Sequence, residues 1–85
     1  MNVLLQPGLA APLGASVEPG GVNFALVAPE ATAVTLCVYS TDGQHETQRL
    51  AMSARSGDVW HGWLPGAGPG LVYGYRVRGP WAPTS

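Results

Sequence analysis

The sequence predicts an all-β sandwich of six to seven short antiparallel strands. Twelve glycines and eight prolines divide the 85 residues into short segments. No segment of eleven or more residues has the apolar period of a helix without a glycine or proline inside it. Helices of the usual length are therefore not expected. Between the interruptions, side chains alternate with a period of two, and β-branched and aromatic residues are common, as is typical of strands.

Three strands are expected in the first half of the chain. Gly14 to Glu18 is a short strand that ends at a Pro-Gly-Gly turn. Gly21 to Ala28 alternates apolar residues such as Val22 and Phe24 with their neighbours. Ala33 to Ser40 alternates in the same way and runs into a Thr-Asp-Gly turn. These segments have the length and punctuation of strands joined by tight turns.

Three further strands are expected in the second half. Glu46 to Met52 is the most polar of them. Val59 to Leu64 follows a Ser-Gly-Asp turn, and Leu71 to Arg78 follows the glycine-rich loop Gly66 to Gly70. Strands of this number and spacing are typical of an immunoglobulin-like sandwich, which the chain is long enough to form as one domain.

Charge and composition exclude several classes of partner. The formal net charge is -1, with four arginines and no lysine, so the basic stripe that nucleic-acid binding requires is missing. No apolar run approaches the roughly 20 residues of a membrane helix. Residues 1–15 lack the basic start of a signal peptide, and Cys37 is the single cysteine. We therefore expect a cytoplasmic protein that binds neither nucleic acid nor membrane.

The ionisable residues indicate neither an enzyme nor a metal protein. The five carboxylates lie at or beside predicted turns, and nothing pairs two of them as glycoside hydrolysis requires. Cys37, His45 and His61 fall in three different elements, so no metal-ligand cluster forms at sequence level. We expect no catalytic residue, no metal and no cofactor in this chain.

The aromatic residues of the last third are the stronger indication of function. An exposed indole offers an apolar platform for the ring face of a neutral sugar, and nearby polar groups can bind its hydroxyls. We take Trp81 and Trp63 as candidate carbohydrate-binding residues, with Arg76 as a hydrogen-bond donor. Trp60 shares a face with Leu64 and is expected in the core, which leaves Trp63 partly exposed. Packing in the core or against another domain is the alternative for each ring.

Several short motifs occur in a recognisable order. They are Pro12-Leu13-Gly14-Ala15, Gly21-Val22-Asn23-Phe24, Trp60-His61-Gly62, Pro69-Gly70, Tyr73-Gly74-Tyr75-Arg76-Val77 and Gly79-Pro80-Trp81. The series closely resembles the N-terminal domain of bacterial glycogen-debranching enzymes of the isoamylase type. Those domains belong to carbohydrate-binding module family 48 and have an early-set immunoglobulin-like sandwich.

The resemblance implies a non-catalytic module of a larger protein. A (β/α)8-barrel of glycoside hydrolase family 13 is expected after Ser85, and that barrel would hydrolyse α-1,6 branch linkages in glycogen or limit dextrin. Residues 1–11 are then an N-terminal lead-in, 12–81 the sandwich module and 82–85 the start of a linker. The module would pack against the barrel and contact α-glucan.

The resemblance also bears on sugar binding by the module itself. Sugar-binding members use two tryptophans and a lysine, of which Trp81 matches one tryptophan, whereas Gly74 occupies the lysine position. The loop Ser40 to Gln44 lacks the second tryptophan. This pattern favours packing against the barrel as the main role. An autonomous module that binds glycogen or another α-glucan is the alternative, and a protein-interaction sandwich is a second one.

Overall fold

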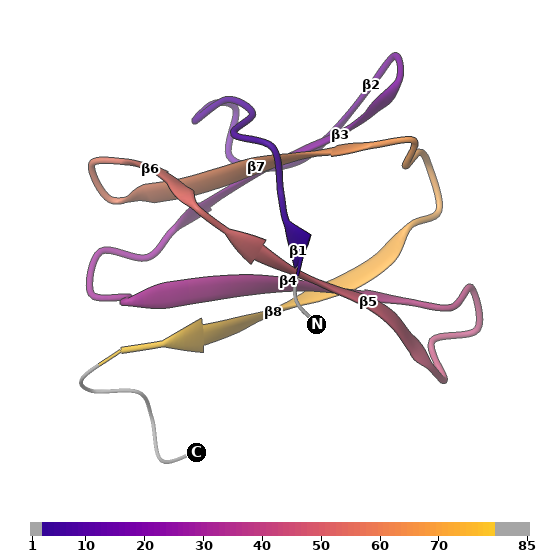
Figure 1. The fold of residues 1–85 in the computed structure, drawn as a ribbon. Coiled ribbons are helices and arrows are strands. Elements are labelled where there is room, and N and C mark those ends of the chain that lie inside the picture. The colour runs from indigo at the N-terminus through magenta and orange to yellow at the C-terminus, as the bar shows by residue number, and fades with distance from the viewer. Residues whose placement is uncertain (1–2, 80–85) are drawn as a thin grey trace.

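The computed structural model describes residues 3–79 and confirms the all-β sandwich (Figure 1). Eight strands form two four-stranded sheets, in the orders β1-β5-β4-β8 and β2-β3-β7-β6. The strands are β1 (Val3–Leu4), β2 (Gly14–Glu18), β3 (Gly21–Val27), β4 (Ala33–Tyr39), β5 (Glu46–Met52), β6 (Ala54–Ser56), β7 (Val59–Pro65) and β8 (Val72–Arg78). Between residues 3 and 79 there is no helix that could span a membrane.

Six of these strands coincide with the six predicted ranges, and their ends differ from the prediction by at most one residue. The two others, β1 and β6, have only two and three residues, too few for an alternation to be visible in sequence. β1 pairs with β5 in parallel, whereas the other strand pairs are antiparallel, as predicted. The predicted turn at Gly57 joins β6 to β7, and its positive φ of 60° suits a glycine.

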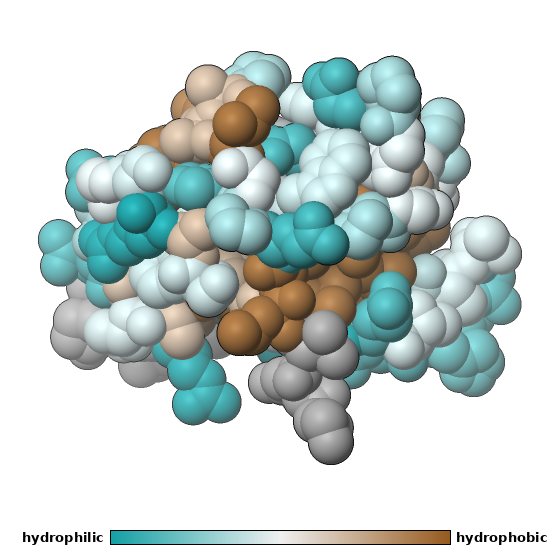
Figure 2. Space-filling model, turned by 45° about the horizontal axis from the view of Figure 1, so that its top comes forward, coloured by the Kyte–Doolittle hydropathy of each residue, from teal (hydrophilic) through white to brown (hydrophobic). Residues whose placement is uncertain are grey.

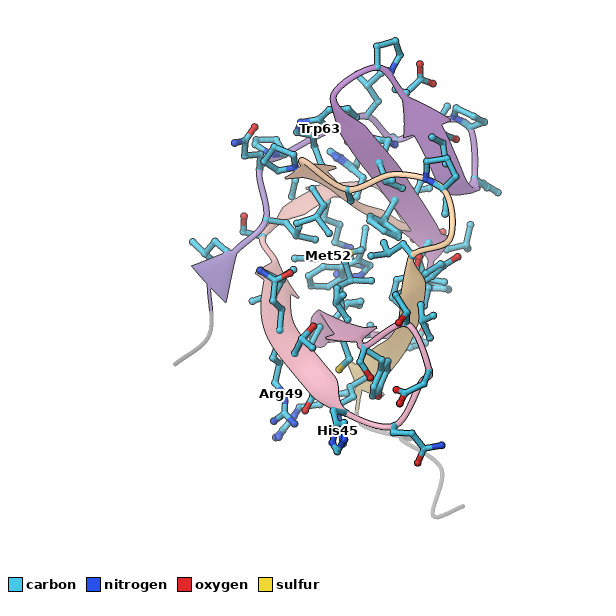
Figure 3. All side chains as sticks on the ribbon, turned by 90° about the vertical axis from the view of Figure 1, so that its right-hand side faces the viewer. His45, Arg49, Met52 and Trp63 are labelled. Atoms are coloured by element: carbon cyan, nitrogen blue, oxygen red, sulfur yellow. The ribbon has the colours of Figure 1, made fainter. Side chains whose placement is uncertain are left out.

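The core lies between the two sheets and receives alternate side chains from each. Phe24 from β3 and Leu36 from β4 are fully buried. Trp60 is 8% exposed, which confirms it as a core residue, and Leu64 packs against the same cluster. Figure 3 shows Met52 between the sheets. Burial of these apolar side chains is the main contribution to folding in so small a domain.

The N-terminal segment runs from one sheet to the other. The Leu5 N–H donates to a carbonyl of β5 at 2.9 Å, and the Gln6 carbonyl accepts from the Trp63 N–H at 2.8 Å. The side chain of Leu5 is 5% exposed and fills space left by Gly62, where a Cβ atom would come within 2.7 Å of Leu5 Cδ1. The described part of the lead-in therefore packs as part of the sandwich.

Candidate binding site around Trp63

Trp63 projects from β7 onto the outer face of the β2-β3-β7-β6 sheet. Since side chains alternate along a strand, Trp60 and Leu64 face the core and Trp63 faces outward. The indole lies over Gly21 of β3, where a Cβ atom would come within 2.5 Å of Trp63 Cζ2. Trp63 remains partly exposed, which confirms the prediction for this ring.

Polar side chains from the neighbouring strands lie beside the indole. Ser16 of β2 is opposite Asn23 of β3, and Asn23 is opposite Trp63 of β7, so the three share one face. Glu18 lies two residues after Ser16 and faces the same way. Together with the N-terminal loop they enclose a pocket of about 370 Å³, which we call the Trp63 pocket. Its lining residues are Gly8, Leu9, Ala11, Pro12, Ser16, Glu18, Asn23 and Trp63.

Asn23 fixes the loop that forms one wall of this pocket. Its Oδ1 accepts from the Leu9 N–H at 2.8 Å, and its Nδ2 donates to the Leu9 carbonyl at 2.9 Å. Gly8 precedes this contact with a φ of 64°, and a Cβ atom there would lie 2.5 Å from Asn23 Oδ1. Only glycine fits so close to the sheet. The wall is therefore held in place without a ligand.

His61 holds the same loop at Pro7. The His61 ring is buried, with Nδ1 2.7 Å from the Pro7 carbonyl oxygen and Nε2 2.8 Å from Ser56 Oγ. A carbonyl only accepts, so Nδ1 carries the proton and donates to Pro7, and in the neutral ring Nε2 then accepts from the Ser56 hydroxyl. Both ring nitrogens are thus engaged, and His61 serves to attach the loop to β6 and β7.

Arg76 lies on the other sheet and does not approach the Trp63 pocket. It is opposite Thr35, whereas its neighbour Tyr75 is opposite the buried Leu36, so Arg76 points away from the core on the outer face of the β1-β5-β4-β8 sheet. A ligand a few sugar units long cannot contact Trp63 and Arg76 together, because the whole sandwich lies between them. Trp81, the third candidate, lies outside the described residues.

A cluster of charged groups surrounds Arg76. Arg49 donates to both carboxylate oxygens of Glu46, at 2.7 and 3.2 Å, and this pairing holds the pKa of the Glu46 carboxyl below its usual range. Burial raises the pKa of the Cys37 thiol and Glu46 raises it further, while Arg76 opposes both effects. Figure 3 shows Arg49 and His45 at one end of the molecule and Trp63 at the other.

Sequence reasoning did not identify Ser16, Glu18 and Asn23 as site residues. Glu18 is the last residue of β2, as the predicted strand Gly14 to Glu18 has it, but nothing in the sequence placed its exposed side chain beside Trp63. A polar Asn23 inside an otherwise apolar strand was the available signal, since a buried amide must find partners. Within residues 3–79, no group of three His, Cys, Asp or Glu residues is placed to hold a metal ion.

The family model described as carbohydrate-binding module 48 (isoamylase N-terminal domain) matches residues 12–85. The chain is 60% identical over 80 residues to the glycogen debranching enzyme of Klebsiella pneumoniae (strain 342), and 54% identical to that of Pectobacterium atrosepticum. Each match covers 94% of this chain and 12% of the relative, so the chain spans about an eighth of the length of these proteins.

Solved structures of pullulanases contain a domain with the same fold as this chain. The pullulanase of Paenibacillus barengoltzii, solved in complex with maltohexaose and α-cyclodextrin, matches with a TM-score of 0.74 and 28% identity over 88% of this chain and 12% of its own. The pullulanase of Bacillus acidopullulyticus has the same fold, with a TM-score of 0.76 at 22% identity, over 88% of this chain and 9% of its own. The chain therefore belongs to the carbohydrate-binding module 48 family, the isoamylase N-terminal domain.

Proposed function

We propose that this module is the non-catalytic accessory domain of a glycogen-debranching enzyme, packs against the catalytic barrel of that enzyme and contacts α-glucan. The observation that carries the proposal is the 60% identity, over nearly the whole module, to an enzyme named for glycogen debranching. In such a parent, hydrolysis of α-1,6 linkages belongs to the barrel, and the module contributes docking and substrate contact.

An open side of the sandwich supports docking against a neighbouring domain. β2 and β8 are edge strands of their sheets, and Tyr73 of β8 packs edge-to-face on Phe24 at 5.0 Å, which brings these edges to the same side. Val17, Tyr73 and Val77 face inward there but are 54%, 37% and 48% exposed. Uncovered apolar residues at one edge are typical of an interaction surface.

The surface as a whole suits neutral partners. Charged residues make up 11% of the sequence, and the net charge is -1. Figure 2 shows apolar residues gathered in two areas of one face, with hydrophilic residues around them. A neutral, partly apolar surface is compatible with another domain and with a glucan. We also propose a cytoplasmic location, since the single cysteine, Cys37, is a buried free thiol.

Activity of the full-length parent tests the proposal. The enzyme should release linear chains from glycogen limit dextrin, and a form without residues 1–79 should be less active and melt at a lower temperature. The double variant Val17→Asp and Val77→Asp in the full-length protein should lower the melting temperature in the same direction, because it places charges in the docking surface. A parent that does not cleave branch linkages, or whose activity and melting do not change on deletion, would refute it.

Autonomous glucan binding is the second candidate function. The Trp63 pocket favours it, because it is formed within the module and needs no other domain. Titration of the 85-residue chain with maltohexaose tests this candidate, and sugar binding by a module whose deletion leaves the activity and melting of the parent unchanged would favour it over docking.

A further inference from the structure

We propose that the Trp63 pocket binds one glucosyl unit of an α-1,4-glucan, which stacks on the Trp63 indole and donates hydroxyl hydrogen bonds to Glu18. This inference rests on the proposed function and specifies where the glucan is held. The site lies on the β2-β3-β7-β6 sheet, on the opposite side of the molecule from Arg76 and its charged cluster.

The indole of Trp63 supplies the apolar platform. Because Gly21 has no side chain, the ring can lie directly over this position of β3, which supports it from one side. Its remaining surface lines the pocket together with Leu9 and Pro12. A pyranose ring has an apolar face of C–H groups, and stacking that face on a fixed indole buries apolar surface at little cost in side-chain entropy.

Glu18 and Ser16 supply the polar contacts. Both line the pocket, and neither makes a side-chain hydrogen bond to another residue within the described part of the chain. The Glu18 carboxylate accepts from sugar hydroxyls, and the Ser16 hydroxyl both donates and accepts. Asn23 uses its oxygen and one N–H on Leu9, which leaves a second N–H for a ligand. These groups together offer both hydrogen-bond donors and acceptors to the hydroxyls of a sugar.

The same lining excludes other ligand classes. Among the described residues, 3–79, Glu18 is the only charged one that lines the pocket, so phosphate groups and nucleic acids are repelled. Cationic ligands of the ammonium type are held by cages of several aromatic faces, whereas this pocket has a single ring. The volume of about 370 Å³ lies near the lower end of the roughly 300–1,000 Å³ range of ligand pockets, which suits a small neutral unit.

The wall of the pocket is formed before a ligand arrives. Asn23 holds Leu9, and His61 holds Pro7, so both contacts tie the loop over residues 7–12 to the sheet. The loop is already ordered in the free module, so binding a ligand costs no further conformational entropy of this loop. This preorganisation distinguishes the pocket from a gap that closes only around a ligand.

Titration with maltohexaose tests the site. In ¹⁵N-labelled 85-residue chain, the Trp63 indole N–H signal should shift saturably, with a dissociation constant on the order of 1 mM. Trp63→Ala should weaken binding by about tenfold or more, and Glu18→Ala should weaken it severalfold, since each removes direct contacts. Val27→Ala is the matched control, because Val27 is exposed on the outer face of the same sheet but does not line the pocket. Dispersed amide signals check that each variant is folded.

Three outcomes would overturn the inference and are distinguishable. If Arg76→Ala abolishes binding and Trp63→Ala does not, the glucan is held on the other sheet, and the proposed function survives. If the wild-type chain gives no saturable shift, the module does not contact glucan by itself. If Trp63→Ala lowers the melting temperature of the full-length enzyme without changing its affinity for maltohexaose, the pocket is occupied by the parent chain.

Discussion

The guanidinium carbon of Arg55 lies 5.2 Å from the centroid of the Trp60 ring, so a residue of the short strand β6 covers a core indole. The same guanidinium donates to the carbonyls of Pro29, Ala31 and Gly57, at 2.8, 3.3 and 2.9 Å. Arg55 thereby ties β6 to the connection between β3 and β4. At the β6 edge of the sandwich, the side chain that covers Trp60 is thus a hydrogen-bonded arginine and not an apolar residue.

Replacing Arg55 should therefore destabilise the fold. We expect Arg55→Ala to lower the free energy of unfolding by about 2 kcal/mol, from lost hydrogen bonds to carbonyls and the lost cation–π contact. Arg78→Ala, at an exposed side chain of β8, is the control and should change it by less than about 0.5 kcal/mol. Urea denaturation measures both, and equal losses would contradict a specific role for Arg55.

Among the substitutions proposed here, replacement of Trp60 should lower the free energy of unfolding the most. The ring is 8% exposed, and its Nε1 donates to the Ala28 carbonyl at 3.3 Å. Trp60→Ala should cost about 3–5 kcal/mol, a large share of the stability of a small domain. Trp63→Ala should cost clearly less, since that ring is partly exposed. If calorimetry gave Trp60→Ala the same melting temperature as the wild type, Trp60 would not be part of the core.

Asn23 should protect the N-terminal loop from opening. Removing its amide leaves the Leu9 N–H and carbonyl without these partners, and we expect Asn23→Ala to cost about 1–3 kcal/mol. Hydrogen exchange should show faster exchange at the Leu9 amide. Ser16→Ala, opposite Asn23 on β2, should leave that amide protected. Unchanged exchange at Leu9 in Asn23→Ala would mean that the loop is held by other contacts.

Acid should destabilise the fold through two carboxyls near the β4–β5 turn. A hydrogen bond from the Ser40 hydroxyl and another from the Gln44 N–H hold the pKa of Asp42 below its usual range, and Arg49 does the same for Glu46. A pKa lower in the folded state than in the unfolded state adds stability above about pH 4, which is lost as the pH falls through the folded-state pKa. Melting temperature against pH measures this, and the double variant Asp42→Asn and Glu46→Gln should have a flatter acid limb. An acid limb as steep as in the wild type would locate the effect at other groups.

Alkali should act through Tyr75. Burial, and to a smaller extent the nearby Tyr73 with ring centroids 5.7 Å apart, together raise the pKa of this phenol to about 12. Since the folded-state pKa exceeds the unfolded value of about 10, the stabilising effect is complete below pH 10 and is lost as the pH rises toward 12. Between pH 10 and 12, the denaturant concentration at the unfolding midpoint should fall for the wild type and stay nearly constant for Tyr75→Phe. If Tyr75→Phe lost as much stability as the wild type over this pH range, the loss would come from the titration of another group.

Much of the fold could be read from local patterns. The alternation in Gly21–Val27 and Ala33–Tyr39 places strands and their buried faces, because a strand repeats every two residues whatever its partners. The same rule assigned Trp60 to the core and Trp63 to the outer face. By contrast, β1 has two residues and no turn signal of its own, so neither its strand state nor its parallel pairing with β5 is visible locally.

The candidate site was only partly predictable. Trp63 could be chosen from its face and its chemistry, but its neighbours Ser16 and Glu18 come from a strand more than 40 residues earlier in the chain. Their position beside the indole depends on the registers of β2 with β3 and of β3 with β7. A slip of one residue in either register would turn these side chains to the other face.

The sequence by itself determined the six longer strands, their buried faces and the family, because alternation, turn residues and short motifs are local properties of the chain. The tertiary structure alone decided which surface residues meet. It separated Trp63 from Arg76 onto the outer faces of different sheets, and it joined Trp63 to Glu18 and to the Asn23-bound loop. The physical reason is that strand pairing across long separations sets these distances, and no local pattern encodes a register between distant strands.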